Sequence, residues 1–94
     1  MANTPLYNFQ IAESKQFEKI KPKIDKKLYA KIVNNVYPQL KANPFFGTHI
    51  KKLKGKFSNY YRYRLGNYRL FYLIDNDKVI VIITDLHYRQ NAYQ

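Results

Sequence analysis

The chain has 94 residues, enough for a single domain with one sheet and one or two helices but too few for a second lobe. A hydrophobic content of 46% argues against wholesale disorder, and the absence of cysteine excludes disulfides and thiolate metal sites. The formal net charge of +11 favours a polyanionic partner, with nucleic acid ahead of an acidic protein and an anionic membrane surface.

The charges are unevenly distributed along the chain. No acidic residue stands between Lys26 and Ile74, and the arginines all lie in the C-terminal third, from Arg62 to Arg89. Arginine grips phosphate through two parallel hydrogen bonds and stacks on bases, so we expect a site in the C-terminal half. The lysines, concentrated upstream, supply a general electrostatic surface.

We expect a soluble, cytoplasmic protein that forms one domain over residues 1–94 and does not enter a membrane. No apolar run approaches the roughly 18 residues of a membrane span. The first residues, MANTPLYNF, lack the basic-then-apolar pattern of a signal peptide.

The N-terminal half predicts one strand and two helices. Leu6–Ile11 alternates between polar and apolar residues, as a short strand does. Apolar residues at spacings of three and four then run from Phe17 to Leu40, which predicts a helical face broad enough to cover a sheet.

Two prolines divide the helical stretch. Pro22 fits the first turn of a helix and not its middle, so we expect helices over about 13–20 and 22–41. Pro38 should distort the last turn of the second helix. The segment KANPFFGTH then ends that helix and opens a loop through IKKLKGKF.

The C-terminal half predicts an antiparallel meander. Three strands are expected over about 59–65, 68–75 and 78–85. Gly66-Asn67 suits a two-residue hairpin turn with glycine first, and Asn76-Asp77 suits another two-residue turn. The predicted fold is therefore α+β, in the order β-α-α-β-β-β, with an antiparallel sheet and two N-terminal helices packed on one face.

The Gly66-Asn67 turn fixes which residues share a face of the sheet. It sets Arg64 opposite Arg69 and Arg62 opposite Phe71, with the tyrosines and leucines of the hairpin on the other face. Like charges directly opposite each other destabilise a sheet. Solvated side chains on an exposed face are the alternative interpretation, but a facing pair with a third arginine and no nearby acid favours an anion site.

The apolar residues of the same face refine this interpretation. If Asn76-Asp77 is also a two-residue turn, four apolar residues join the arginines. They are Phe71, Leu73, Ile80 and Ile82. An apolar floor with a cationic rim suits a stacked base and its phosphate.

The segment from Asn43 to Tyr93 resembles the RelE/ParE superfamily of bacterial type II toxins, and most closely the RelE-type mRNA interferases. The resemblance rests on a combined pattern: NP-F, then KKLKG, then YR-x-R-x-G-x-YR-x-x-Y, and a final R-x3-Y. The upstream strand and helices also have the order of this family. The resemblance implies a RelE-like fold and a ribosome-dependent endoribonuclease that cuts mRNA through attack of the 2′-hydroxyl. It also implies a cognate antitoxin.

The resemblance also implies a set of catalytic residues. Arg62 and Arg64 stand where the family has paired Lys or Arg, and Arg69 matches the arginine of its GYR motif. Arg89 and Tyr93 match the C-terminal arginine and the tyrosine that stacks on a base. We expect the arginines to stabilise the charge that develops on phosphorus.

We expect further contacts to mRNA and ribosomal RNA from basic and aromatic residues around this set. They are Lys51, Lys52, Lys54, Lys56, Tyr60, His87 and Tyr88. Tyr88 stands where many relatives have His, and His87 is one position earlier.

The proton-transfer groups stay open at this stage. Arginine keeps its proton to a pKa above about 12, so Arg64 is a poor base. Lysines 51, 52 and 54, His49 and His87 are all candidates for the base, and Arg89 or a tyrosine for the acid. We expect no cofactor and no metal site, since the two histidines and the scattered acids have no ligand spacing.

Two other functions remain candidates. A ParE-type toxin would share the fold and poison DNA gyrase without cutting RNA, although ParE-type chains usually lack this set of arginines and tyrosine. A catalytically impaired RNA- or ribosome-binding relative is the second, because Tyr88 replaces His and Arg64 replaces a lysine.

Overall fold

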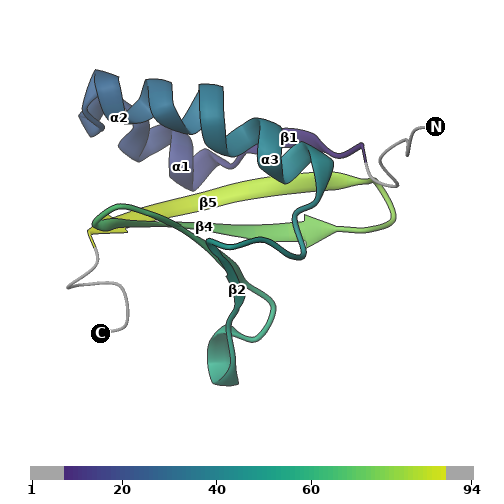
Figure 1. Cartoon of the computed structure of the whole chain (residues 1–94). Coiled ribbons are helices and arrows are strands. Elements are labelled where there is room, and N and C mark those ends of the chain that lie inside the picture. Colours follow the sequence, from purple (N-terminus) through teal and green to yellow (C-terminus); the bar gives the residue numbers. More distant parts are fainter. Residues whose placement is uncertain (1–7, 89–94) are drawn as a thin grey trace.

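A computed structural model of the protein describes residues 8–88, and it has a five-stranded sheet covered on one face by helices (Figure 1). The strands lie in the order β1-β5-β4-β3-β2. Their bounds are β1 Gln10–Glu13, β2 Ile50–Lys52, β3 Tyr61–Leu65, β4 Tyr68–Asp75 and β5 Ile80–Tyr88. The predicted α+β class and one-sided helical layer are confirmed, and β2 is a fifth strand that the predicted order β-α-α-β-β-β lacks.

The expectation of a wholly antiparallel sheet is wrong: the sheet is mixed, because β1 runs parallel to β5 while the other neighbours are antiparallel. β1 begins later than the predicted 6–11, of which residues 6 and 7 lie outside the described part. Its pairing with β5 runs on to Ser14, whose N–H donates to the Ile83 carbonyl. Glu13 interrupts the apolar alternation, so the alternation does not predict this end of the strand.

The helical layer is divided into more pieces than the two predicted helices. Its pieces are α1 Lys15–Ile20, the 3-10 turn η1 Lys21–Lys23, α2 Lys26–Lys31, the π turn η2 Ile32–Val36 and α3 Tyr37–Ala42. The predicted start of the second helix at residue 22 is wrong. Ile24 has an extended backbone, and the Asp25 carboxylate caps the backbone N–H groups of Lys27 and Leu28. Within residues 8–88, no helix is long and apolar enough to cross a membrane.

Pro38 distorts the helix one turn earlier than expected. Proline has no N–H to donate and its ring crowds the carbonyl four residues before it. The turn ahead of Pro38 is therefore widened, and the Tyr37 N–H donates to the Ile32 carbonyl, five residues back.

The core lies between the helical layer and the inner face of the sheet. Phe17, Ile32 and Leu40 from the helices are fully buried against Leu70 and Tyr72 of β4. The Tyr72 hydroxyl donates to the Pro44 carbonyl at 2.7 Å, which satisfies the only polar atom of a large buried ring. The helices thus cover the tyrosine and leucine face of the hairpin, as predicted.

The expected loop through IKKLKGKF contains the short edge strand β2 and a 3-10 turn, η3, Gly55–Phe57. We call residues 52–60 the basic arm. Its two ends are joined by the Leu53 N–H, which donates to the Tyr60 carbonyl at 2.9 Å, and Leu53 is buried. Figure 1 shows this arm hanging from the sheet on the side away from the helices.

One of the two predicted hairpin turns is confirmed and the other is wrong. Gly66 has a φ of 58°, which the first position of a glycine-first turn requires, and Leu65 pairs with Tyr68. The β4–β5 connection is a four-residue loop over 76–79, because Asp75 pairs with Ile80. This register differs by two residues from the predicted one, so Ile80 and Ile82 keep the predicted face.

Candidate RNA-binding face

The three described arginines lie on the outer face of the sheet, which the helices leave uncovered. Arg64 pairs directly with Arg69, and Arg62 pairs with Phe71, as the turn register predicted. On the other side of Arg62, Lys51 is its partner on β2. Three neighbouring strands therefore bring four cationic side chains to one face. We call this the arginine face.

Within residues 8–88, no carboxylate forms an ion pair with these charges. Lys21 is the only lysine or arginine of this part of the chain that pairs with a carboxylate, and Asp85 contacts His87 instead. The Nε atom of Arg62 is buried and has no hydrogen-bond partner among the described residues. A buried donor without a partner costs about 1–3 kcal/mol, so Arg62 is held here at the expense of stability.

Arg69 is placed by the hairpin turn itself. Its NH1 atom donates to the carbonyls of Gly66 and Tyr68, at 3.2 and 3.1 Å. These bonds fold the guanidinium back over the turn and fix its position beside Arg64. The remaining N–H groups of the fork are available for an anion.

A β-bulge brings a histidine and an aspartate to the arginine face. Tyr72 pairs with Ile83 but Phe71 pairs with Asp85, so Thr84 is the extra residue of β5. The buried Thr84 hydroxyl donates to the Phe71 carbonyl at 3.2 Å. Beyond the bulge the alternation is inverted, and His87 lies opposite Arg69.

The His87 ring is held on two sides. Its Nε2 atom lies 2.7 Å from Oδ2 of Asp85, and the same carboxylate oxygen accepts a hydrogen bond from the Gln16 amide of α1 at 3.1 Å. The Phe71 ring meets the imidazole edge-on, with centroids 5.3 Å apart. Phe71 is only 8% exposed although no helix covers this face.

The basic arm carries exposed lysines around an exposed aromatic ring. Lys52, Lys54 and Lys56 are exposed, as is Phe57, and the Lys56 ammonium lies 5.7 Å from the centre of the Phe57 ring. Lys52 is the last residue of β2, and beyond it the arm projects on the side of the sheet away from the helices (Figure 1), which is the side of the arginine face. Phosphate contacts and base stacking are the chemistry that such a surface supports.

The other predicted site residues are placed as follows. Tyr60 is half-buried and immediately precedes β3. Lys52 pairs with Tyr61, and Tyr88 pairs with Tyr68, so both belong to the inner face by register. The Tyr88 ring is exposed and packs edge-on against Tyr68, 5.4 Å away. Arg89 and Tyr93 lie outside the described residues.

Sequence inspection missed Asp85, Phe57 and the role of Phe71. Asp85 is the last acid of the chain and stands two positions before His87, a spacing that places both on one side of a strand. That spacing was the available signal. An aromatic residue between Lys56 and Ser58 in a loop was the signal for Phe57.

The acidic side chains of the helical side are engaged in local structure. Asp25 caps α2, and Glu13 accepts hydrogen bonds from the hydroxyls of Tyr29 and Tyr37, at 2.7 and 2.8 Å, and from Lys21 at 2.9 Å. No group of three or more His, Asp or Glu side chains within the described part of the chain is arranged to hold a metal ion.

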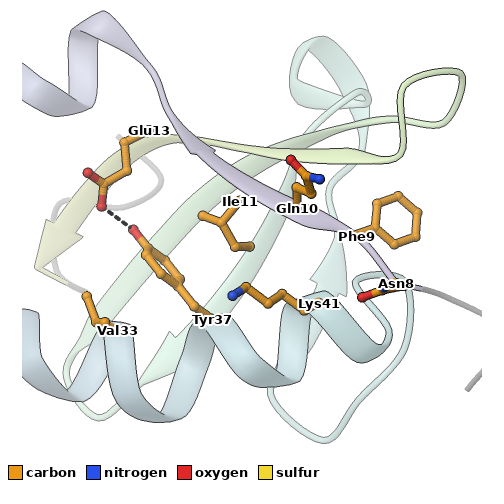
Figure 2. A pocket seen from close by; sticks show the side chains of 8 residues that line it. All are labelled: Asn8, Phe9, Gln10, Ile11, Glu13, Val33, Tyr37 and Lys41. Carbon is orange, nitrogen blue, oxygen red and sulfur yellow. Dashed lines mark hydrogen bonds between the residues drawn. The ribbon is translucent and has the colours of Figure 1, made fainter.

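Glu13 also lines a groove of about 560 Å³ between β1 and α3, shown in Figure 2. Burial alone would raise the pKa of the Glu13 carboxyl. The hydrogen bonds from Tyr29, Lys21 and Tyr37 outweigh burial and hold that pKa below its ordinary value of 4.5. Since its polar partners are all internal, Glu13 is a structural residue of this groove.

We predict that Glu13→Gln lowers the free energy of unfolding at pH 7 by about 2 kcal/mol, or roughly 10 °C in Tm. A lowered pKa stabilises the fold above the ordinary value, and this contribution disappears as pH falls through the native pKa. The difference between wild type and variant should therefore shrink below about pH 4.5. Thermal unfolding from pH 3 to 7 measures it.

Glu18→Gln is the matched control. Glu18 also pairs with Lys21, at 3.3 Å, but its side chain is 52% exposed. Exposed ion pairs contribute about 0–1 kcal/mol, so this variant should unfold close to wild type at every pH. An equal effect of the two changes would show that net charge, and not the buried carboxylate, sets the stability.

Comparison with known proteins identifies relatives in sequence and in structure. A family described as ParE toxin of type II toxin-antitoxin system, parDE, matches residues 12–93. No curated protein matches the chain in sequence. Seventeen solved chains match it in structure.

Three of these structures span nearly the whole chain. The RelBE2 toxin-antitoxin complex of Mycobacterium tuberculosis is 20% identical, covers 95% of this chain and 100% of its own, and has a TM-score of 0.79. The archaeal RelE-RelB complex of Pyrococcus horikoshii OT3 is 25% identical, covers 90% of this chain and 99% of its own, and has a TM-score of 0.73. The YoeB dimer of Staphylococcus aureus is 27% identical, covers 86% of this chain and 97% of its own, and has a TM-score of 0.65.

Proposed function

The chain belongs to the ParE toxin family, within the RelE/ParE superfamily of type II toxin-antitoxin toxins, and on that premise we propose that it is a ribosome-dependent endoribonuclease that cleaves mRNA. The superfamily resemblance expected from the sequence is thereby confirmed. The activity is our proposal, because the superfamily contains both mRNA interferases and ParE-type toxins.

One observation carries the proposal. Arg62, Arg64 and Arg69 stand side by side on an uncovered face, with no carboxylate partner among residues 8–88. Arg64 faces Arg69 against their mutual repulsion, and Arg62 keeps a buried donor unpaired. A bound phosphodiester would relieve both costs, and a pentavalent phosphorane, which carries more negative charge, would relieve them further.

The proposed reaction needs only the RNA itself. The 2′-oxygen bonds to phosphorus as its proton leaves, and the bond from phosphorus to the 5′-oxygen breaks, leaving a cyclic phosphate and a 5′-hydroxyl. The arginines contact the non-bridging oxygens, where charge accumulates in the transition state. Arg89 and Tyr93, which precede the C-terminus by only a few residues, remain predicted members of this set.

Ribosomal RNA and a cognate antitoxin are the proposed partners. The basic arm adds cations and an exposed Phe57 beside the arginine face, which suits the phosphates and bases of ribosomal RNA. RelBE2 and the archaeal RelE-RelB pair are toxin-antitoxin complexes. By analogy we expect an acidic or amphipathic segment of an antitoxin to cover the arginine face and silence it.

The test is cleavage on purified ribosomes programmed with a short defined message. We expect 5′ ends to appear at fixed positions within codons in the ribosomal decoding site, and free message to stay intact. Primer extension maps the cuts. Message that stays uncut on the ribosome would refute the proposal.

Gyrase inhibition is the second candidate, and the match to the ParE toxin family is the observation that favours it. Supercoiling of relaxed plasmid by purified gyrase, with and without the chain, tests it directly. Blocked supercoiling together with intact message would establish the ParE-type function.

A further inference from the structure

The structure contains a pair of side chains that the arginine chemistry leaves unused. His87 lies opposite Arg69, and Asp85 holds its imidazole from the same strand. Three arginines account for the charge on phosphorus, but none of them can take a proton at neutral pH. We propose that His87 is the general base that removes the 2′-hydroxyl proton and that Asp85 is its positioning residue. This inference rests on the proposed function.

The hydrogen bond to Asp85 selects the tautomer of His87. An ionised carboxylate can only accept, so the proton of a neutral imidazole must be on Nε2, which lies 2.7 Å from Oδ2. The lone pair is therefore on Nδ1, which has no hydrogen-bond partner among the described residues. A base that is held by a carboxylate through one nitrogen and free at the other is the arrangement that proton abstraction requires.

The surroundings fix the ring and supply the charges. Phe71 packs edge-on with the imidazole, and Gln16 donates to the same oxygen of Asp85, so both side chains are held by a second contact. By strand register, the charged groups of the described residues near the imidazole are Asp85 on β5, Arg69 opposite it on β4 and Arg64 beyond Arg69 on β3. Lys23 and Asp25 line a pocket together with Asp85, and α1 contributes the uncharged Gln16 as the partner of Asp85.

The step balances without a co-reactant. The 2′-O–H bond breaks as the 2′-O–P bond forms, and Nδ1 of His87 takes the proton. The P–O5′ bond breaks, and the 5′-oxygen takes a proton from water. The imidazolium then returns its proton to the solvent, so no oxidant, reductant or metal is consumed.

Single-turnover cleavage on programmed ribosomes tests the base. We expect His87→Gln to lower the rate by about 10²- to 10³-fold. The wild-type rate should rise tenfold per pH unit at low pH and then level off, because only the neutral ring accepts a proton. His87→Gln should lose this dependence. The structure removes the other histidine, His49, from the candidates for the base, because its ring packs against that of Tyr63 of the inner face, 5.4 Å away. His49→Gln should therefore retain both the rate and the profile.

Asp85→Asn tests the positioning role. An amide can donate to Nε2 as well as accept, so the ring is no longer held in one tautomer. We expect a roughly 10- to 100-fold lower rate with unchanged ribosome binding. Nitrogen-15 NMR of the free protein should show Nε2-protonated His87 in wild type and a mixture of tautomers in Asp85→Asn.

Three outcomes would overturn the inference. If wild type and His87→Gln cut at the same rate with the same pH profile, His87 is not the base, although the nuclease function stands. If His87 is protonated on Nδ1 in wild type, Asp85 does not set its tautomer and the positioning role is refuted. Wild type that does not cut removes the proposed function, and the base with it. Far-ultraviolet circular dichroism and Tm confirm that each variant is folded.

Discussion

Replacing Arg62 and Arg64 together by methionine is expected to lower mRNA cleavage by at least about 10³-fold and, at the same time, to raise the Tm by about 5 °C. The loss follows because two cations that stabilise the transition-state charge disappear, each contributing roughly 10²-fold or more. Methionine keeps the long apolar stem, so packing on Phe71 is retained. Single-turnover cleavage, growth inhibition and thermal unfolding are the measurements.

The expected gain in stability has two sources. The double change removes the unpaired buried Nε atom of Arg62, which costs about 1–3 kcal/mol. It also removes the repulsion between Arg64 and Arg69, a cross-strand contribution of about 0.2–1 kcal/mol. The double change also removes the favourable hydration of two guanidinium groups, and this loss offsets part of the gain in stability. A net gain of about 1 kcal/mol, or about 5 °C in Tm, is therefore a conservative expectation.

The matched control is Lys26→Met with Lys27→Met at the start of α2. It removes the same two charges from two exposed positions on the helical side. Its cleavage rate should stay within about threefold of wild type. A double arginine variant that unfolds at lower temperature, or that still cuts, would contradict our account. Arg69 is a poorer probe, because its substitution also removes two hydrogen bonds of the hairpin turn.

The β3–β4 hairpin was predictable because its register depends on local chemistry. A glycine-first turn admits only one pairing, and a slip by one residue would move every tyrosine and leucine away from the core. Arg64 therefore had to face Arg69. The four-residue loop at 76–79 gives a register two residues away from the predicted one, which preserves the faces of Ile80 and Ile82 because strand side chains alternate with period two.

The bulge at Thr84 was not predictable by alternation. Uninterrupted pairing would have put Leu86 and Tyr88 on the arginine face and Asp85 and His87 against the helices. The apolar Leu86 is instead partly buried against the core on the inner side, and this tertiary preference favours the inversion. The candidate base could thus be named from the sequence, but its place opposite Arg69 could not.

The breaks in the helical layer show the same limit. The Asp25 cap and the missing N–H of Pro38 are local signals, and both act in the structure. Packing decides which turn of the helix is widened, since Ile32 and Val36 at the two ends of the π turn are both fully buried. A widened turn keeps both side chains on the core face despite the proline.

Replacing Lys52, Lys54 and Lys56 together by glutamine is expected to weaken ribosome binding about 100-fold while leaving the fold intact. Each lysine that contacts a phosphate contributes about 1 kcal/mol, and three contacts amount to roughly two factors of ten. All three lysines are exposed, and Lys54 and Lys56 lie beyond β2 in the part of the arm that projects away from the helices, so Tm should change by less than about 2 °C. Filter binding to purified ribosomes measures the affinity.

Salt dependence separates local phosphate contacts from the overall field of the protein. If the three ammonium groups contact phosphates, the slope of log affinity against log salt should fall by about two to three units in the triple variant. Lys26→Gln, Lys27→Gln and Lys31→Gln together change the net charge equally, from exposed positions on α2. That control should shift affinity by less than about fivefold at physiological salt, because charges beyond the Debye length of about 8 Å are screened. Equal losses in both triple variants would show that net charge, and not the basic arm, directs the protein to the ribosome.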